Sequence, residues 1–134
     1  MSVVVDSSVV VAALVDTGAN GTWAEKILEQ DGLYAPEHLR VEAANVLRRL
    51  ERGKQITEQE ASAAFEDLIE LNVELHAFEA FSERVWELRH NVAVYDGWYV
   101  ALAEALDLPL ATLDGRLARA DGPKCRFLTP DSNK

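Results

Sequence analysis

The sequence predicts a single α/β domain in which a parallel sheet of about four to five strands is flanked by helices. Two observations support this fold class. Short apolar runs alternate with longer stretches of helical periodicity, and neither a linker nor an internal repeat divides the 134 residues. A chain of this length buries a substantial core as one unit, so we expect residues 1–134 to form one domain.

In the first half of the chain, turn signals separate short apolar runs from helical patterns. Three consecutive valines are typical of a buried strand, and two helical stretches follow, divided by a turn rich in Gly, Asp and Asn. Pro36 stops the second strand, and Gly53 ends the long helix after it. The predicted elements are a strand over 3–5, a helix over 9–15, a turn over 16–21, a helix over 22–30, a strand over 33–35 and a helix over 37–51.

The second half begins at Thr57, because the residues TEQE from Thr57 onward fit the capping-box pattern of a helix start. Phe81, Val85 and Leu88 form one apolar stripe of a later helix. Two short apolar runs near the C-terminus are typical of further strands. The predicted elements are a helix up to about 71, a strand over 73–75, helices over 78–91 and 96–106, a strand over 108–112, a short helix over 114–120 and a strand over 126–128.

Composition restricts the class of function. The net charge of −10 argues against a sequence-reading nucleic-acid binder with a broadly basic surface, but it does not exclude a nuclease. No apolar run is long enough to span a bilayer, and the N-terminus lacks the basic region of a signal peptide, so we expect a cytoplasmic protein without membrane contact. The only cysteine, Cys125, excludes an internal disulfide.

Three aspartates stand at the starts of predicted helices. Asp6 follows the first strand, Asp114 follows the strand over 108–112, and Asp96 opens the helix between them. Because carboxyl ends of parallel strands meet at one edge of a sheet, where such proteins place their sites, we expect these carboxylates to converge. Each of them, taken alone, is also explained as a helix N-cap.

Glu42 is harder to explain as a structural residue. Residues three and four apart on a helix share a face. Glu42 shares its face with the apolar residues Leu39, Ala43, Val46, Leu47 and Leu50. A buried glutamate without a partner costs several kcal/mol unless a partner or a metal compensates for its desolvation. The alternative is that Glu42 lies at the edge of the stripe and reaches water.

Together, the four acids predict a site for a divalent cation, because carboxylates crowded together repel one another unless a cation lies between them. Oxygen ligands suit Mg²⁺, for which Mn²⁺ can substitute. Such an ion lowers the pKa of a bound water and orients a phosphate oxygen, which is most of what phosphodiester hydrolysis requires. The hydroxyls of Ser8 and Thr112 stand beside the acids and are expected to orient ligands or waters.

Basic and aromatic residues near these acids suggest contacts with a nucleic acid. Arg48, Arg49 and Arg116 either follow phosphates at the rim of the site or belong to ordinary solvated helix faces. Trp98 is expected in the core or at an interface, and stacking of Trp98 and Tyr99 on a base is the less favoured alternative. For His38, one helical turn before Glu42, we expect a solvent-exposed or phosphate-contacting ring and not a metal ligand.

The chain also resembles a known family. VVVDSS at 3–8, PEHLRVEAANVLRR at 36–49 and YDGWYVALAEALDLPLATLD at 95–114 are similar, in order and spacing, to motifs of the PIN-domain ribonucleases, and most of all to the VapC toxins of prokaryotic toxin–antitoxin modules. The resemblance implies a PIN-like fold and a Mg²⁺-dependent endoribonuclease that acts as the toxin of a type II system. It also implies a homodimer and a small VapB-like antitoxin partner that blocks the site. It assigns Asp6, Glu42, Asp96 and Asp114 as the metal-binding and catalytic residues.

Rival functions fit less well. A receiver domain would need an acidic pair after the first strand, and a haloacid-dehalogenase-type phosphatase would need Asp-x-Asp, whereas two serines follow Asp6. A PIN-like RNA- or protein-binding module without catalysis is disfavoured because all four acids are present. The sequence does not identify the RNA that is cleaved, nor whether one or two metal ions bind.

Overall fold

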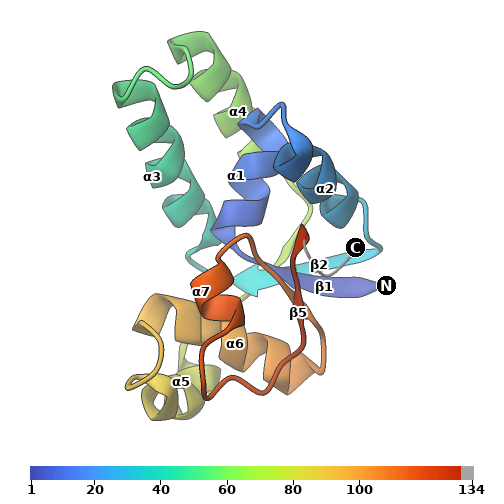
Figure 1. Cartoon of the computed structure of the whole chain (residues 1–134), viewed down its shortest axis with the longest axis vertical. Coiled ribbons are helices and arrows are strands. Elements are labelled where there is room, and N and C mark those ends of the chain that lie inside the picture. Colours follow the sequence, from blue (N-terminus) through green and yellow to red (C-terminus); the bar gives the residue numbers. More distant parts are fainter. Residues whose placement is uncertain (131–134) are drawn as a thin grey trace.

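The computed structural model describes residues 1–130 and contains a five-stranded, all-parallel sheet in the order β3-β2-β1-β4-β5 (Figure 1). The last four residues of the predicted domain lie outside this described range. The strands are β1 (Ser2–Val5), β2 (Gly32–Pro36), β3 (Glu74–His76), β4 (Leu110–Ala111) and β5 (Phe127–Leu128). The predicted fold class, a parallel α/β sheet of about five strands flanked by helices, is therefore confirmed.

Helices cover both faces of this sheet, with α1 to α4 on one side of β1 and β2 and α5 and α6 on the other (Figure 1). The helices are α1 (Ser7–Val15), α2 (Ala19–Leu28), α3 (Leu39–Arg52), α4 (Glu58–Glu70), the 3₁₀ turn η1 (Glu79–Phe81), α5 (Ser82–Leu88), α6 (Val94–Leu106) and α7 (Gly115–Ala118). Because both faces are covered, the three valines of the central strand β1 are buried: Val3, Val4 and Val5 are each 0% exposed.

Most predicted elements lie within a few residues of the observed ones, and the capping box at Thr57 is present as expected. The helix predicted over 78–91 is wrong in length. It is divided into η1 and α5, and it ends at Leu88, where the chain turns through Arg89, His90 and Asn91, which continue no apolar stripe. The strand predicted over 108–112 is also shorter, because only Leu110 and Ala111 pair with both neighbouring strands.

Three helices begin earlier than predicted: α1 at Ser7, directly after its N-cap Asp6, and also α2 and α6. α2 starts at Ala19, inside the predicted turn, so Gly21 is part of the helix. Gly21 permits a close approach of two backbone segments and not a bend, since a Cβ there would lie 1.8 Å from the backbone oxygen of Asp16. α6 starts at Val94 with Ala93 as its N-cap, so Asp96 lies in the first turn of the helix and caps nothing. None of the helices within residues 1–130 has the length and apolar character needed to cross a membrane.

Candidate active site

The strand order places a natural site at the carboxyl ends of β1 and β4. Connections from β1 lead first to β2 and β3 on one side, and the chain then returns to β4 and β5 on the other side. The sheet reverses its order between β1 and β4, and ligands of open α/β sheets bind at such a point. Asp6 directly follows β1 and Thr112 directly follows β4, so both residues stand at this edge.

Asp6 is the centre of a hydrogen-bond network at this edge. Its carboxylate, only 7% exposed, accepts a hydrogen bond from the Ser8 hydroxyl at 2.5 Å and one from the Val9 backbone N–H at 3.2 Å on Oδ1. Its Oδ2 accepts a hydrogen bond of 2.5 Å from the Thr112 hydroxyl. The bond from Val9 makes Asp6 the N-cap of α1, so the capping role expected as an alternative is also real.

The two hydroxyls around Asp6 also fix the loop that follows β4. Ser8 Oγ accepts a hydrogen bond from the Leu113 N–H at 3.1 Å, and Thr112 Oγ1 accepts one from the Asp114 N–H at 2.9 Å. Each hydroxyl therefore donates to the carboxylate and accepts from the backbone. The network holds the carboxylate of Asp6 in one orientation and places Asp114 beside it.

Burial determines the charge state of Asp6 in the absence of a cation. Removal from water raises its pKa to about 6, and the nearby charge of Asp96 acts in the same direction. The hydrogen bonds from Ser8, Thr112 and Val9 oppose this change but do not cancel it. Near neutral pH the carboxylate is therefore more easily neutralised than an exposed one, and a bound cation would favour its charged form.

Glu42 reaches the site from the first turn of α3. Its side chain is 28% exposed, and its Oε1 accepts a hydrogen bond of 2.8 Å from the hydroxyl of Tyr99. His38 Nε2 lies 3.4 Å from Oε2. Burial raises the pKa of Glu42, but the contacts with His38, Tyr99 and Ser7 outweigh it and leave the pKa below its ordinary value. Glu42 is thus a charged, half-buried carboxylate.

Asp96 and Asp114 differ in how they are held. Asp96 is half-buried and its carboxylate makes no hydrogen bond within residues 1–130. Burial raises the pKa of Asp96, and the charges of Asp114 and Glu42 raise it further. Asp114 is exposed and caps α7, because its Oδ1 accepts hydrogen bonds from the backbone N–H groups of Arg116 and Leu117 at 2.9 and 3.2 Å. The charge of Asp96 therefore acts on Asp6, and the charges of Asp114 and Glu42 act on Asp96.

Comparison with known proteins agrees with this geometry, since residues 3–123 match the PIN domain family. The chain belongs to the PIN-domain family. Ribonuclease VapC1 of Mycobacterium tuberculosis is 43% identical over 126 residues, which cover 92% of this chain and 94% of the relative. Ribonuclease VapC12 of the same species is 34% identical over 120 residues, covering 90% of this chain and 92% of the relative. The prediction of a VapC-type PIN ribonuclease, the toxin of a toxin–antitoxin system, is confirmed.

Solved structures share the fold of this PIN domain. PAE2754 from Pyrobaculum aerophilum aligns with a TM-score of 0.73 at 19% identity and covers 99% of this chain and 86% of its own. FitAcB from Neisseria gonorrhoeae aligns with a TM-score of 0.67 at 17% identity and covers 96% and 97%. Identities this low support the fold alone.

The acidic site of the PIN domain fits a hydrated ion better than a closed protein cage. Within residues 1–130, no three Asp, Glu, His or Cys side chains are arranged to hold one ion between them. Mg²⁺ does not require this, because it keeps several waters and binds through one or two carboxylates. The carboxylate of Asp96 is half-buried, and burial and the neighbouring acids raise its pKa, so a bound cation would favour its charged form.

The predicted RNA-binding arginines are spread widely over this PIN domain. Arg116 lies two residues after Asp114, in the first turn of α7, and is exposed. Arg48 and Arg49 are also exposed, but they lie six and seven residues after Glu42 on α3, which is about 10 Å along the helix axis. Arg116 can therefore contact a phosphate beside the site, whereas the α3 arginines would contact RNA only farther away.

Aromatic residues around the site were only partly anticipated. The expectation of a solvent-exposed His38 ring is wrong: the ring is packed between Tyr95, Trp98 and Tyr99, and neither ring nitrogen has a hydrogen bond within residues 1–130. Its contact with a phosphate stays a prediction. Tyr99, for which only base stacking was considered, is buried, and its hydrogen bond to Glu42 was missed. The available signal was its position three residues after Asp96, on the same face of the helix.

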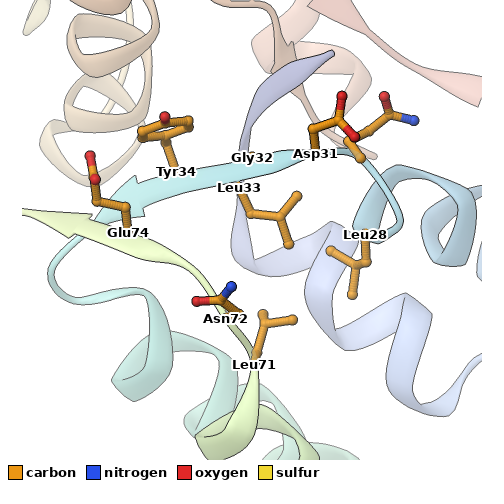
Figure 2. A pocket seen from close by; sticks show the side chains of 9 residues that line it. Leu28, Asp31, Gly32, Leu33, Tyr34, Leu71, Asn72 and Glu74 are labelled. Carbon is orange, nitrogen blue, oxygen red and sulfur yellow. The ribbon is translucent and has the colours of Figure 1, made fainter.

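Another hollow, at the opposite end of β2, has no comparable chemistry. It encloses about 310 Å³ near Asp31, Tyr34, Asn72 and Glu74 (Figure 2). Asp31 there is paired with the N-terminal ammonium group of Met1 at 2.9 Å. The carboxyl edge of the sheet, with Asp6, is therefore the candidate active site.

Proposed function

We propose that this VapC-type PIN domain hydrolyses RNA phosphodiester bonds as an endoribonuclease, with Mg²⁺ bound at Asp6 and Asp96 and with Mn²⁺ able to replace it. The observation that carries the proposal is the buried carboxylate of Asp6, oriented by two hydroxyls, with the charge of Asp96 acting on it. Burial of this carboxylate is costly for a residue with only a structural role, because burial disfavours its charged form.

The roles of the residues follow from how each is held. Ser8 and Thr112 keep Asp6 in one orientation, so that it presents a fixed ligand. Asp96 and the second oxygen of Asp114 are available as further ligands, directly or through water, while the hydroxyl of Tyr99 holds Glu42 in place to orient a water. Mg²⁺, when bound, supplies a water of lowered pKa and a contact for the phosphate oxygen. Arg116, two residues after Asp114, would contact the RNA backbone.

Substitution of the acids tests this function. Asp6→Asn and Asp96→Asn should each reduce RNA cleavage by roughly a hundredfold or more, the scale on which a single charge-stabilising group acts in an active site. Asp67→Asn is the matched control, because Asp67 is an exposed acid on α4 and its loss changes the net charge equally. EDTA should stop cleavage, and added Mg²⁺ or Mn²⁺ should restore it.

Two outcomes would contradict the proposal. Full cleavage by Asp6→Asn would show that the network around Asp6 is structural. Binding of RNA by the wild-type protein without cleavage, in Mg²⁺ and in Mn²⁺, would favour the alternative of a PIN-like binding module. Mapping new RNA 5′ ends after induction of the protein in cells would identify the cleaved RNA.

We also propose that a small antitoxin blocks this site. A groove of about 550 Å³ between α1 and α3 begins at Ser7 and Ser8, beside Asp6, and is lined by apolar side chains that include Val11, Val46 and Ile56. The solved VapBC2 structure from Rickettsia felis, whose fold this chain shares, is described as bound to a DNA fragment from their promoter. A partner helix in the groove would place an Arg or Lys against the carboxylates, where bidentate pairing is favourable.

A structure of the complex tests the antitoxin proposal. A basic side chain of the partner within hydrogen-bonding reach of Asp6, Glu42, Asp96 or Asp114 is the expected result. A partner bound only at the opposite edge of the sheet would contradict it. The homodimer implied by the family is a separate proposal, and light scattering of the purified protein would measure it.

A further inference from the structure

A cluster of aromatic rings lies at the rim of the acidic site. The ring of His38 stacks on that of Trp98, with centroids 4.6 Å apart and planes 4° apart. Tyr95 also lies against His38, with ring centroids 5.4 Å apart and planes tilted by 31°. Phe78 supports Trp98 edge-on at 5.1 Å. The rings therefore hold one another in fixed positions.

Only one ring of this cluster offers a large free surface. Tyr95 is 66% exposed, whereas Tyr99 is 1% exposed and Trp98 is half-buried beneath His38. Tyr95 directly precedes Asp96 in the chain, and the His38 ring that supports it lies 3.4 Å from Glu42. The exposed ring of Tyr95 is thus next to the acidic site in two ways: through Asp96 in the chain and through its contact with His38.

The chemistry of the rim favours one part of an RNA molecule. The acids repel phosphates unless a cation lies between them, and the whole chain carries a net charge of −10. The nucleobase is uncharged and stacks on an aromatic ring without regard to that charge. Basic nucleic-acid-binding proteins gain affinity from contacts to phosphates. At this acidic rim, contacts to bases can supply that affinity instead.

We propose that Tyr95, supported by His38 and Trp98, is the platform on which a nucleobase next to the scissile phosphate stacks. This inference rests on the proposed ribonuclease function and adds a substrate-positioning residue to it. It replaces the earlier alternative that Trp98 or Tyr99 would stack on a base, because both of those rings are already covered.

Trp86 provides a comparison within the same protein. It is 62% exposed, nearly as much as Tyr95, but it lies on α5, and the guanidinium of Arg89 covers its ring at 4.3 Å from the centroid. Tyr95 has no such cationic cover within residues 1–130. Trp86→Ala is therefore the matched control for removing an exposed aromatic ring away from the acids.

The test compares substitutions at Tyr95 on a short RNA that contains a mapped cleavage site. Tyr95→Ala should weaken binding and lower kcat/KM by roughly five- to a hundredfold, the range expected when one stacked base is lost. Tyr95→Phe and Tyr95→Trp should retain most of the activity, because the ring and not the hydroxyl supplies the stacking. Trp86→Ala should cleave like wild type, and the melting temperatures of the four variants verify that the fold is intact.

A second readout separates stacking from a merely structural effect. An abasic nucleotide at each position around the cleaved bond removes one base at a time. At the stacked position, the abasic RNA should lower kcat/KM of the wild-type protein as much as Tyr95→Ala lowers it on intact RNA. The variant acting on the abasic RNA should show no further loss. If the two losses multiply at every position, Tyr95 acts through something other than a base.

Failure of this inference differs from failure of the proposed function. Cleavage and binding by Tyr95→Ala equal to those of wild type, with an active wild type, would refute the platform alone and would assign the ring to contact with a protein. A wild-type protein that neither cleaves RNA nor binds labelled RNA in fluorescence anisotropy would refute both.

Discussion

Replacing Asp6 by asparagine should make the metal-free protein more stable at neutral pH. The pKa of Asp6 is raised by burial from 3.8 to about 6, so the folded state holds this proton more tightly than the unfolded state does. Stability is therefore lost as the pH rises from about 4 through 6. Each pKa unit corresponds to about 1.4 kcal/mol, so the ionised carboxylate costs the metal-free fold about 3 kcal/mol above pH 7.

Asparagine removes this cost but disturbs one hydrogen bond. Its oxygen can still accept from the Ser8 hydroxyl and the Val9 N–H, whereas its NH₂ group then faces Thr112, whose hydroxyl now donates to the carboxylate. Losing that bond costs about 1 kcal/mol. The variant should thus be less stable than wild type by about 1 kcal/mol near pH 4 and more stable by about 2 kcal/mol near pH 7.5.

Thermal and urea unfolding in EDTA across this pH range measure the effect. A gain of about 2 kcal/mol corresponds to a melting temperature about 6 to 10 °C higher for a domain of this size. Asp67→Asn again serves as control, because it removes an exposed charge and should show no such crossing. Saturating Mn²⁺ should reverse the order, since an ion at a hundred times its Kd stabilises wild type by about 2.7 kcal/mol. A stability difference that does not change between pH 4 and 7.5 would refute the reasoning.

Four further substitutions have definite expected outcomes. Metal-free Asp96→Asn should melt above wild type at neutral pH and gain less from Mn²⁺, because its half-buried carboxylate is repelled by neighbouring acids; melts in EDTA and in Mn²⁺ measure both effects. Tyr99→Phe should cost about 1 kcal/mol in urea unfolding and slow RNA cleavage, and an unchanged cleavage rate would show that the hydroxyl does not position Glu42. Gly97→Ala should raise the melting temperature, with a gain of up to about 1 kcal/mol, because a Cβ there meets side chains at an ordinary 3.5 Å. Gly21→Ala should lower the melting temperature, with a loss of about 1–3 kcal/mol in stability, because the Cβ would lie 1.8 Å from a backbone oxygen.

The acidic site also shows why structural and functional explanations of one residue need not compete. Asp6 and Asp114 cap α1 and α7, as the simplest interpretation of each predicts. In each carboxylate the cap uses only Oδ1, so Oδ2 is the oxygen that a bound cation would contact. A capping interaction orients the carboxylate, so it prepares such a ligand instead of excluding it.

The sequence by itself determined the elements and the kind of residue at each end of them. The valines of β1, the capping box at Thr57 and the acids after β1 and β4 are local patterns, and local patterns reflect local physics: side-chain period, capping and turn preference. The inward position of Glu42 followed from the same kind of reasoning, because helix periodicity fixes which residues share a face.

Only the tertiary structure decided which of these residues meet. Thr112 donates to Asp6 across 106 residues of chain, and Tyr99 donates to Glu42 across 57. Periodicity does not specify such partners, because they depend on the strand order, which places β4 beside β1. The same holds for exposure: Tyr95 and Tyr99 are one helical turn apart on α6, yet one faces solvent and the other fills the core. Which face of a helix is covered depends on what packs against it, and that is a property of the whole fold.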